Sequence, residues 1–219
     1  MNSSQFSIFS KDLQTLAKII PLNWGHIQND STDSQINMFE INSFEELELK
    51  IKFLSESSKN YLRRRWFLWR CAQCDEYIFC LNSNVTNNPN HKDQTYDIEF
   101  NDNYQLRYDI KGTIIPKQFR TKIENVITNP QILIDFFYEE QSRGVRNNIQ
   151  NRFFIIHHSY RQQEREMYLR CYWDFKIRVY AEISKIIFTK KIELNFQNAQ
   201  CHILFLFENL DKTFTYKFI

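Results

Sequence analysis

Three acidic residues and a lysine stand close together in one short stretch of this sequence, YDIEFNDNYQLRYDIKG (residues 96–112). Asp97 and Glu99 alternate with apolar residues before an Asn-Asp-Asn triplet, and Asp109 and Lys111 alternate with apolar residues after it. Such alternation predicts two half-buried strands, and the triplet is typical of the turn between them. All four charged side chains therefore fall on one face of a predicted β-hairpin.

Carboxylates that lie close together on a hairpin repel one another unless a proton, a cation or a metal ion compensates them. With Asp102 at the apex of the turn, the predicted register places Asp97 opposite Arg107 and diagonally from Asp109, at roughly 7–8 Å. Oxygen ligands favour Mg²⁺ or Mn²⁺, and a nearby lysine can orient a water or stabilise charge on a phosphate. This face therefore suits phosphodiester hydrolysis. The alternative is a solvated face with cross-strand ion pairs such as Asp97–Arg107.

The rest of the sequence predicts the elements that must hold this hairpin. Residues 82–94 lack periodicity and predict a loop, whereas the apolar run 152–159 predicts a strand buried on both faces. Apolar spacing predicts helices over about 43–55, 58–81, 130–143 and 162–187, and strands over 190–196, 201–208 and 214–219. The mixed order predicts an α/β fold, with a central mixed sheet flanked by helices. We expect residues 1–57 to form a helical region packed on a core formed by residues 58–219.

Asp97 beside one predicted strand and Asp109-Ile-Lys111 on the next resemble the signature of the PD-(D/E)XK nuclease superfamily. The resemblance spans about residues 59–160 and includes the family order of helix, three strands, helix and strand. It implies a restriction-endonuclease-like core with endonuclease activity that depends on Mg²⁺, for which Mn²⁺ can substitute. It also implies that Asp97 and Asp109 bind the metal ion and that Lys111 positions the nucleophilic water.

The same resemblance implies a supporting glutamate on the preceding helix, for which Glu76 is the candidate. Glu99 can act in place of Asp97 or beside it. This chain departs from the family pattern at Tyr96, because a proline commonly precedes the first acidic residue in the family.

The resemblance implies DNA as the substrate, and we expect it to be double-stranded. A homodimer would supply one site for each strand. A basic and polar segment between a predicted helix and strand carries side chains of the types that contact phosphates and base edges. These candidates for DNA contact are Arg143, Arg146, Asn147, Asn148, Gln150 and Arg152. A plain connecting loop is the alternative for this segment.

Composition limits the remaining classes of function. A net charge of +2 provides no bulk attraction to nucleic acid, and three glycines leave no phosphate-binding glycine loop. The N-terminus lacks the pattern of an export signal and no apolar run is long enough to span a membrane, so the five cysteines predict reduced thiols in a cytoplasm. We therefore expect a prokaryotic restriction or defence nuclease, with a non-catalytic nucleic-acid-binding or assembly subunit as the alternative.

Two further motifs have structural and functional interpretations. Cys71 and Cys74 can form half of a zinc site with Cys80 and His91, but their helical spacing favours packing in the core. In His157-His158, strand alternation points one ring to each face, so both rings cannot bind the same ligand. One of them can lie near the hairpin face, and a structural role is the alternative.

Overall fold

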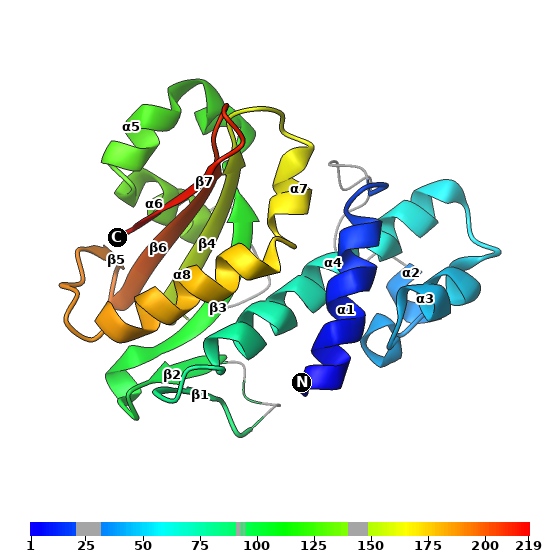
Figure 1. The fold of residues 1–219 in the computed structure, drawn as a ribbon, viewed down its shortest axis with the longest axis horizontal. Coiled ribbons are helices and arrows are strands. Elements are labelled where there is room, and N and C mark those ends of the chain that lie inside the picture. The colour runs from blue at the N-terminus through cyan, green and yellow to red at the C-terminus, as the bar shows by residue number, and fades with distance from the viewer. Residues whose placement is uncertain (21–31, 91–92, 94, 140–148) are drawn as a thin grey trace.

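A seven-stranded mixed sheet with helices on both faces forms the core of the computed structural model (Figure 1). The structure describes residues 1–20, 32–90, 93, 95–139 and 149–219. The strand order is β1-β2-β3-β4-β6-β5, and β7 also pairs with β6. The strands are β1 (Val85–Asn87), β2 (Ile98–Phe100), β3 (Arg107–Ile114), β4 (Arg152–Ser159), β5 (Leu194–Phe196), β6 (Ala199–Glu208) and β7 (Phe214–Phe218). The predicted α/β class, a mixed sheet flanked by helices, is confirmed.

Antiparallel and parallel pairings are combined in this sheet. The first three strands form an antiparallel meander, whereas β3, β4 and β6 run parallel to one another. Both β5 and β7 are antiparallel to β6. The helices are α1 (Ser3–Leu16), α2 (Thr32–Gln35), α3 (Phe44–Ile51), α4 (Glu56–Phe79), α5 (Ile123–Thr128), α6 (Gln131–Glu139), α7 (Arg165–Leu169) and α8 (Trp173–Ile186), with short 3₁₀ helices η1 (Met38–Glu40), η2 (Tyr104–Leu106) and η3 (Lys117–Lys122).

Strand β4 lies at the centre of the sheet, and every one of its residues is buried. Phe153 and Ile155 belong to the apolar cluster that includes α4 and α8. Phe154 and Ile156 belong to the cluster on the other face, which includes α5 and α6. Alternate side chains of one strand thus reach two separate apolar layers, which confirms the prediction that residues 152–159 form a strand buried on both faces.

The long helix α4 supports both the sheet and the N-terminal helices. It begins after Ser55, whose Oγ accepts a hydrogen bond from the backbone N–H of Ser58 at 3.2 Å. The predicted apolar stripe is buried at Phe67, Cys71, Cys74 and Ile78. Leu81 is 53% exposed because the helix ends two residues before it.

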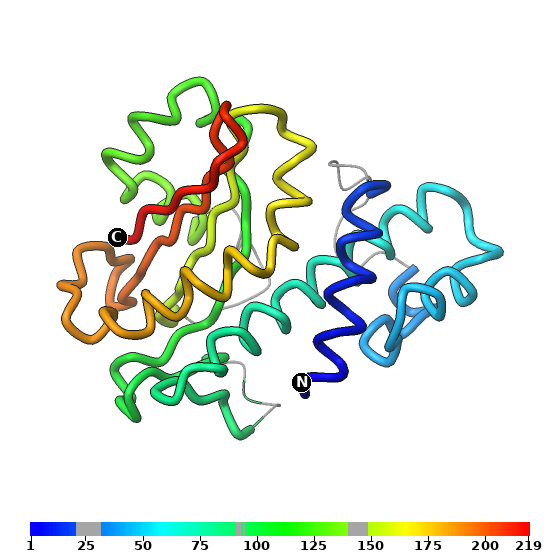
Figure 2. Tube along the Cα trace, viewed as in Figure 1, coloured from blue at the N-terminus to red at the C-terminus, as the bar shows by residue number. Residues whose placement is uncertain are grey.

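Helices α2 and α3 pack on the first half of α4, α1 crosses its middle and reaches Tyr77, and the sheet lies against its second half (Figures 1 and 2). Trp66 lies edge-on to Phe9 of α1, and its Nε1 donates a hydrogen bond to the Ile41 carbonyl at 3.0 Å. The guanidinium of Arg70 lies 4.0 Å from the centre of the Phe9 ring and also donates to the Ile41 carbonyl. Residues before α4 are therefore held against this helix, and α1 also contacts α8, where Trp173 Nε1 donates to the Ser10 carbonyl at 3.2 Å.

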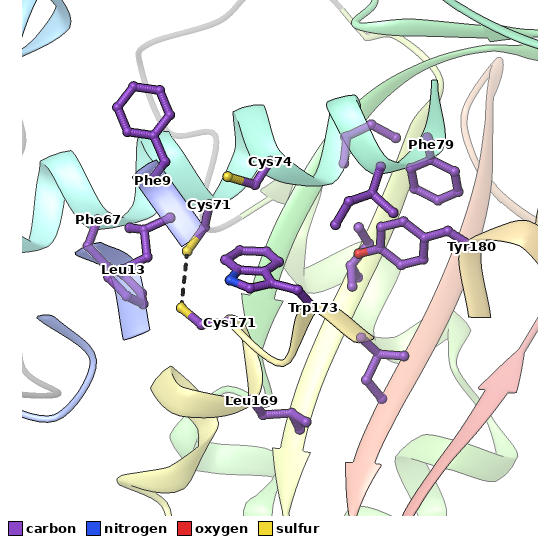
Figure 3. Packing of buried hydrophobic residues seen from close by; sticks show 14 of the residues in the cluster. Phe9, Leu13, Phe67, Cys71, Cys74, Phe79, Leu169, Cys171, Trp173 and Tyr180 are labelled. Carbon is purple, nitrogen blue, oxygen red and sulfur yellow. Dashed lines mark hydrogen bonds between the residues drawn. The ribbon is translucent and has the colours of Figure 1, made fainter. Parts of the chain in front are cut away.

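The thiols of Cys71 and Cys74 lie in the core, which confirms that their spacing indicates packing. Figure 3 shows Cys71 beside Cys171, with 3.9 Å between the two sulfur atoms. Burial raises the pKa of the Cys74 thiol, so it remains protonated and apolar in character. Of the other residues in the zinc alternative, Cys80 is half-buried and His91 lies outside the described residues.

Two predicted elements differ from the observed ones. The predicted helix over 162–187 is two helices, α7 and α8, separated where Arg170 turns inward and becomes buried. The predicted loop over 82–94 contains strand β1, which pairs with β2. Pairing with a distant strand, rather than local periodicity, holds β1 in place. Within the described ranges, no helix combines the length and apolar character needed to cross a bilayer.

Candidate active site

Four charged side chains from α4, the start of β2 and β3 lie within electrostatic reach of one another: Glu76, Asp97, Asp109 and Lys111. Lys111 Nζ forms an ion pair with Asp109 Oδ1. Asp97 Oδ2 accepts a hydrogen bond from the backbone N–H of Ile110 at 2.7 Å, which fixes this carboxyl against the middle of β3. The structure therefore brings together Glu76, Asp97, Asp109 and Lys111 from the predicted site.

The register of the hairpin differs by two residues from the predicted one. Strand pairing aligns Ile98 with Tyr108 and Glu99 with Arg107. The backbone N–H of Asp97 donates to the Tyr108 carbonyl at 2.9 Å, and the Asp97 carboxyl lies within hydrogen-bond reach of Asp109. The difference arises because η2 takes up residues between the turn and β3. A shift of two residues keeps every side chain on its predicted face, and it shortens the distance between the two aspartates.

Glu99 does not join this cluster. It forms an ion pair with Arg107 on the opposite strand. The Arg107 guanidinium also lies 4.6 Å from the centre of the Tyr96 ring. Arg107 thus pairs with Glu99, where the alternative based on a solvated face expected Asp97.

Asp109 is the most buried member of the cluster, with 3% of its surface exposed. Arg152, at the start of β4, places its Nε 3.6 Å from Asp109 Oδ2. The Arg152 guanidinium lies over the ring of Tyr138, 4.3 Å from its centre. Arg152 was expected in a loop that contacts DNA, but it is 5% exposed and faces Asp109, so its position is that of a partner for the cluster.

The other candidates for DNA contact lie in or beside the preceding segment. Gln150 is half-buried, and its backbone carbonyl accepts a hydrogen bond from the Tyr138 hydroxyl at 2.6 Å. The remaining four, Arg143, Arg146, Asn147 and Asn148, lie outside the described residues.

Two carboxyls of the cluster, those of Glu76 and Asp97, hold protons more tightly than isolated acids do. Burial and the nearby Asp97 charge raise the pKa of Glu76 to about 8, although Lys111 opposes this shift. Burial and the Asp109 charge raise the pKa of Asp97 to about 6, and a hydrogen bond between these two carboxyls acts in the same direction. Three carboxyls thus share the cluster with Lys111 and Arg152, and the raised pKa values of two of them reflect burial and mutual repulsion that a bound cation would relieve.

The donor set fits Mg²⁺ in type. Among the described residues, no group of three or more His, Cys, Asp or Glu side chains is arranged to hold a metal ion. Mg²⁺ commonly takes one or two carboxylates and completes its coordination with waters and substrate phosphates. Asp97 and Asp109 face each other and supply two such carboxylates, with Glu76 near them.

We expect the metal-free protein to lose stability as the pH rises from about 4 to about 8. The pKa values of Asp97 and Glu76 are raised to about 6 and about 8 in the folded chain, whereas the unfolded acids titrate near pH 4. Their contribution to stability is therefore complete below about pH 4 and is lost as the pH passes through the two raised values. Mg²⁺ must displace these protons, so its stabilising effect should grow over the same range.

Thermal unfolding at pH 5 and pH 8, with and without Mg²⁺, measures both trends. The variant Asp97→Asn should reduce both the loss of stability with rising pH and the growth of the Mg²⁺ effect, because it removes one titrating carboxyl. An equal effect of Mg²⁺ at both pH values, in wild type and variant, would contradict this account of the cluster.

A second, fully buried polar group lies behind the cluster. Asp75 precedes Glu76 on α4, and its Oδ1 accepts hydrogen bonds from Lys176 Nζ at 2.7 Å and from the Tyr180 hydroxyl at 2.8 Å. All three side chains are at most 1% exposed. Sequence reasoning missed this group, although Lys176 shares helical spacing with the buried Trp173, Tyr180 and Ile183, which was the available signal.

Gly112, next to Lys111, allows this polar group to approach β3. A Cβ atom at Gly112 would lie 3.2 Å from Arg170 Nη1 and 3.7 Å from Asp75 Oδ2. The buried Arg170 therefore occupies space beside Gly112 that a larger side chain would restrict.

The two histidines of β4 have structural positions. His157 is fully buried, and its Nδ1 lies 3.0 Å from the Thr113 carbonyl. Burial holds the pKa of His157 well below its usual value, so this ring is neutral. His158 Nδ1 lies 3.1 Å from Glu166, which also pairs with Arg120. Neither ring contributes to the group formed by Glu76, Asp97, Asp109 and Lys111.

A cavity of about 370 Å³ opens beside the cluster and shares Glu76 and Asp97 with it. One wall is a face of α4, and the other comes from β1 and the segment that leads to β2. Its remaining lining is mainly aromatic and amide side chains, including Trp69, Tyr77, Tyr96, Gln73, Asn87 and Asn88. No family model, curated protein or solved structure matches this chain. Its function must therefore be inferred from these side chains and their contacts.

Proposed function

We propose that this chain is a metal-dependent nuclease that hydrolyses phosphodiester bonds of DNA. The observation that carries the proposal is the convergence of Asp97, Asp109, Lys111 and Glu76 from three separate elements. The order of elements supports it: α4, then β1, β2 and β3, then the helical segment α5–α6, then β4. That is the order of helix, three strands, helix and strand of the PD-(D/E)XK family that the sequence resembles.

Each residue of the cluster has a chemical role in this proposal. Asp97 and Asp109 would hold Mg²⁺, or Mn²⁺ in its place, and the bound ion would polarise a phosphate oxygen and acidify a water. Lys111, which is about one-third exposed, can leave Asp109 and orient the attacking water or neutralise charge on the phosphate. Arg152 keeps the Asp109 carboxyl in place from the buried side.

Glu76 would support the two proposed metal ligands, Asp97 and Asp109. Its raised pKa of about 8 places its proton exchange close to neutral pH, where a group that accepts and returns protons is most effective. Its position on α4, facing the strands that carry both aspartates, lets its carboxyl serve as a further oxygen donor.

Cleavage assays on plasmid DNA, single-stranded DNA and RNA test the proposal, each with Mg²⁺, Mn²⁺ or EDTA. Wild-type protein should cut DNA with either metal ion and should be inactive in EDTA. Asp109→Asn should lower the rate by about 100-fold or more, because it removes a metal ligand. Glu99→Gln is the matched control: it neutralises a carboxylate on the same hairpin that pairs with Arg107, and it should retain most of the activity.

Three other outcomes would contradict the proposed site or the proposed activity. If Glu99→Gln and Asp109→Asn lose activity equally, the cluster is not the site of cleavage. If the wild type cuts none of the three substrates with either metal ion, the proposal fails. DNA that is bound but uncut, with unchanged affinity in Asp109→Asn, would indicate the non-catalytic binding subunit instead.

A further inference from the structure

We propose that the cavity beside Glu76 and Asp97 binds an unstacked nucleobase next to the phosphate that is cut. The identity of that phosphate rests on the proposed function, whereas the base-binding chemistry of the cavity depends on its own lining. The base can come from single-stranded DNA or from a nucleotide turned out of a duplex, because both expose the flat faces of the ring.

The wall formed by α4 connects the cavity to the charged cluster. Trp69, Gln73, Glu76 and Tyr77 follow one another at spacings of four, three and one residues, so they share one face of the helix. Trp69 and Glu76 are separated by about 10 Å along the helix axis, from the rise of 1.5 Å per residue. A ring stacked between these positions would leave its sugar and phosphate directed toward the carboxylates.

The opposite wall holds an aromatic ring directly beside the first aspartate. Tyr96 precedes Asp97 in the chain, and the Arg107 guanidinium lies 4.6 Å from the centre of its ring. Across the cavity, Tyr77 stacks on Phe6 with 4.9 Å between ring centres. Contacts from outside the cavity therefore support the rings, so little side-chain freedom is lost when a base stacks on them.

The lining selects a neutral planar group over an anion. The described residues that line the cavity include no lysine or arginine, and the one ammonium group among them is that of Met1. The carboxylates of Asp93 and Asp97 outnumber it and would repel a phosphate that entered the cavity. Side chains of Gln73, Asn87 and Asn88 offer amide donors and acceptors, which are the groups that pair with base edges. The volume of about 370 Å³ lies within the range of sites that enclose small ligands.

Fluorescence titration tests this inference without requiring cleavage. The probes are a single-stranded DNA of ten nucleotides and an abasic sugar-phosphate chain of the same length, with Ca²⁺ in place of Mg²⁺. The DNA should quench tryptophan fluorescence and the abasic chain should not. All samples carry Trp24→Phe, because Trp24 lies outside the described residues. In this background the quench should disappear in Trp69→Phe, because Trp66 and Trp173 are buried outside the cavity.

A matched pair of tyrosine variants measures the contribution of the cavity to affinity. Tyr96→Leu should weaken binding of the DNA by about 5- to 100-fold, the range found when an aromatic stacking partner is removed. Tyr104→Leu should change it less than about twofold, because Tyr104 is 71% exposed on the same hairpin and lies outside the cavity. Melting temperatures of the two variants should agree, which shows that both chains are folded.

Equal binding of the DNA and the abasic chain, or equal affinity of the two tyrosine variants, would overturn the inference. Failure of the two proposals can be distinguished. A chain that shows the quench but never cuts DNA refutes the nuclease and supports the base-binding cavity. A chain that cuts DNA in Mg²⁺ without showing the quench refutes the cavity alone.

Discussion

Lys111→Met should lower the rate of DNA cleavage by about two to four orders of magnitude, and it should leave metal affinity at least as strong as in the wild type. The two effects separate because Lys111 and a metal ion compete for the same carboxylate. Lys111 Nζ pairs with Asp109 Oδ1, so its removal frees that oxygen for the metal ion. Asp109→Asn, in contrast, should lose affinity for the metal ion together with the rate.

Isothermal titration with Mn²⁺ and single-turnover cleavage measure the two quantities on the same samples. Lys117→Met is the matched control, because Lys117 is exposed just after the end of β3 and should change neither quantity. Full activity in Lys111→Met would remove the lysine from the mechanism. Reduced metal affinity in this variant would mean that Lys111 organises the carboxylates and does not compete with the metal ion.

Lys176→Met should lower the free energy of unfolding by about 3–5 kcal/mol, the cost of leaving one partner of a buried ion pair uncompensated. Lys176 and Asp75 are both at most 1% exposed, and the Tyr180 hydroxyl donates to the same Asp75 oxygen as Lys176 does. For a chain of this length, such a loss corresponds to a fall in melting temperature of roughly 6–20 °C.

Thermal and urea unfolding measure this loss. Lys185→Met, an exposed lysine on the same helix, should stay within about 0.5 kcal/mol of wild type. The double variant Asp75→Leu with Lys176→Met should recover much of the loss, because it removes both charges at once. A single variant as stable as Lys185→Met would show that the buried pair contributes nothing to stability.

Local patterns in the sequence were sufficient for the main elements and for placing Asp97, Asp109 and Lys111 on one face, whereas Glu76 was a candidate only through the resemblance to the nuclease family. Alternation in residues 97–111 fixed which side chains share a face, and helical spacing from Phe67 to Ile78 fixed the buried side of α4. Both signals depend on near neighbours in the chain, and burial of an apolar face is what enforces them.

Features that depend on contacts between distant residues could not be predicted. The register of the hairpin depended on η2, a turn that the alternating pattern does not encode. Arg152 resembled a surface residue in a basic segment, and only the position of Asp109 on the neighbouring strand explains its burial. The cavity likewise has walls from α4 and from residues near β2, which no local pattern relates.

Helix α4 fixes the rotational position of two contact regions relative to each other. Trp66 and Arg70 face residues of the N-terminal region, and Glu76, six residues after Arg70, faces the carboxylates near the strands. A single inserted residue between Arg70 and Glu76 would rotate one half about 100° relative to the other. Substitutions can accumulate along this helix. An insertion or deletion between the two contact regions, in contrast, would turn one of them away from its partners.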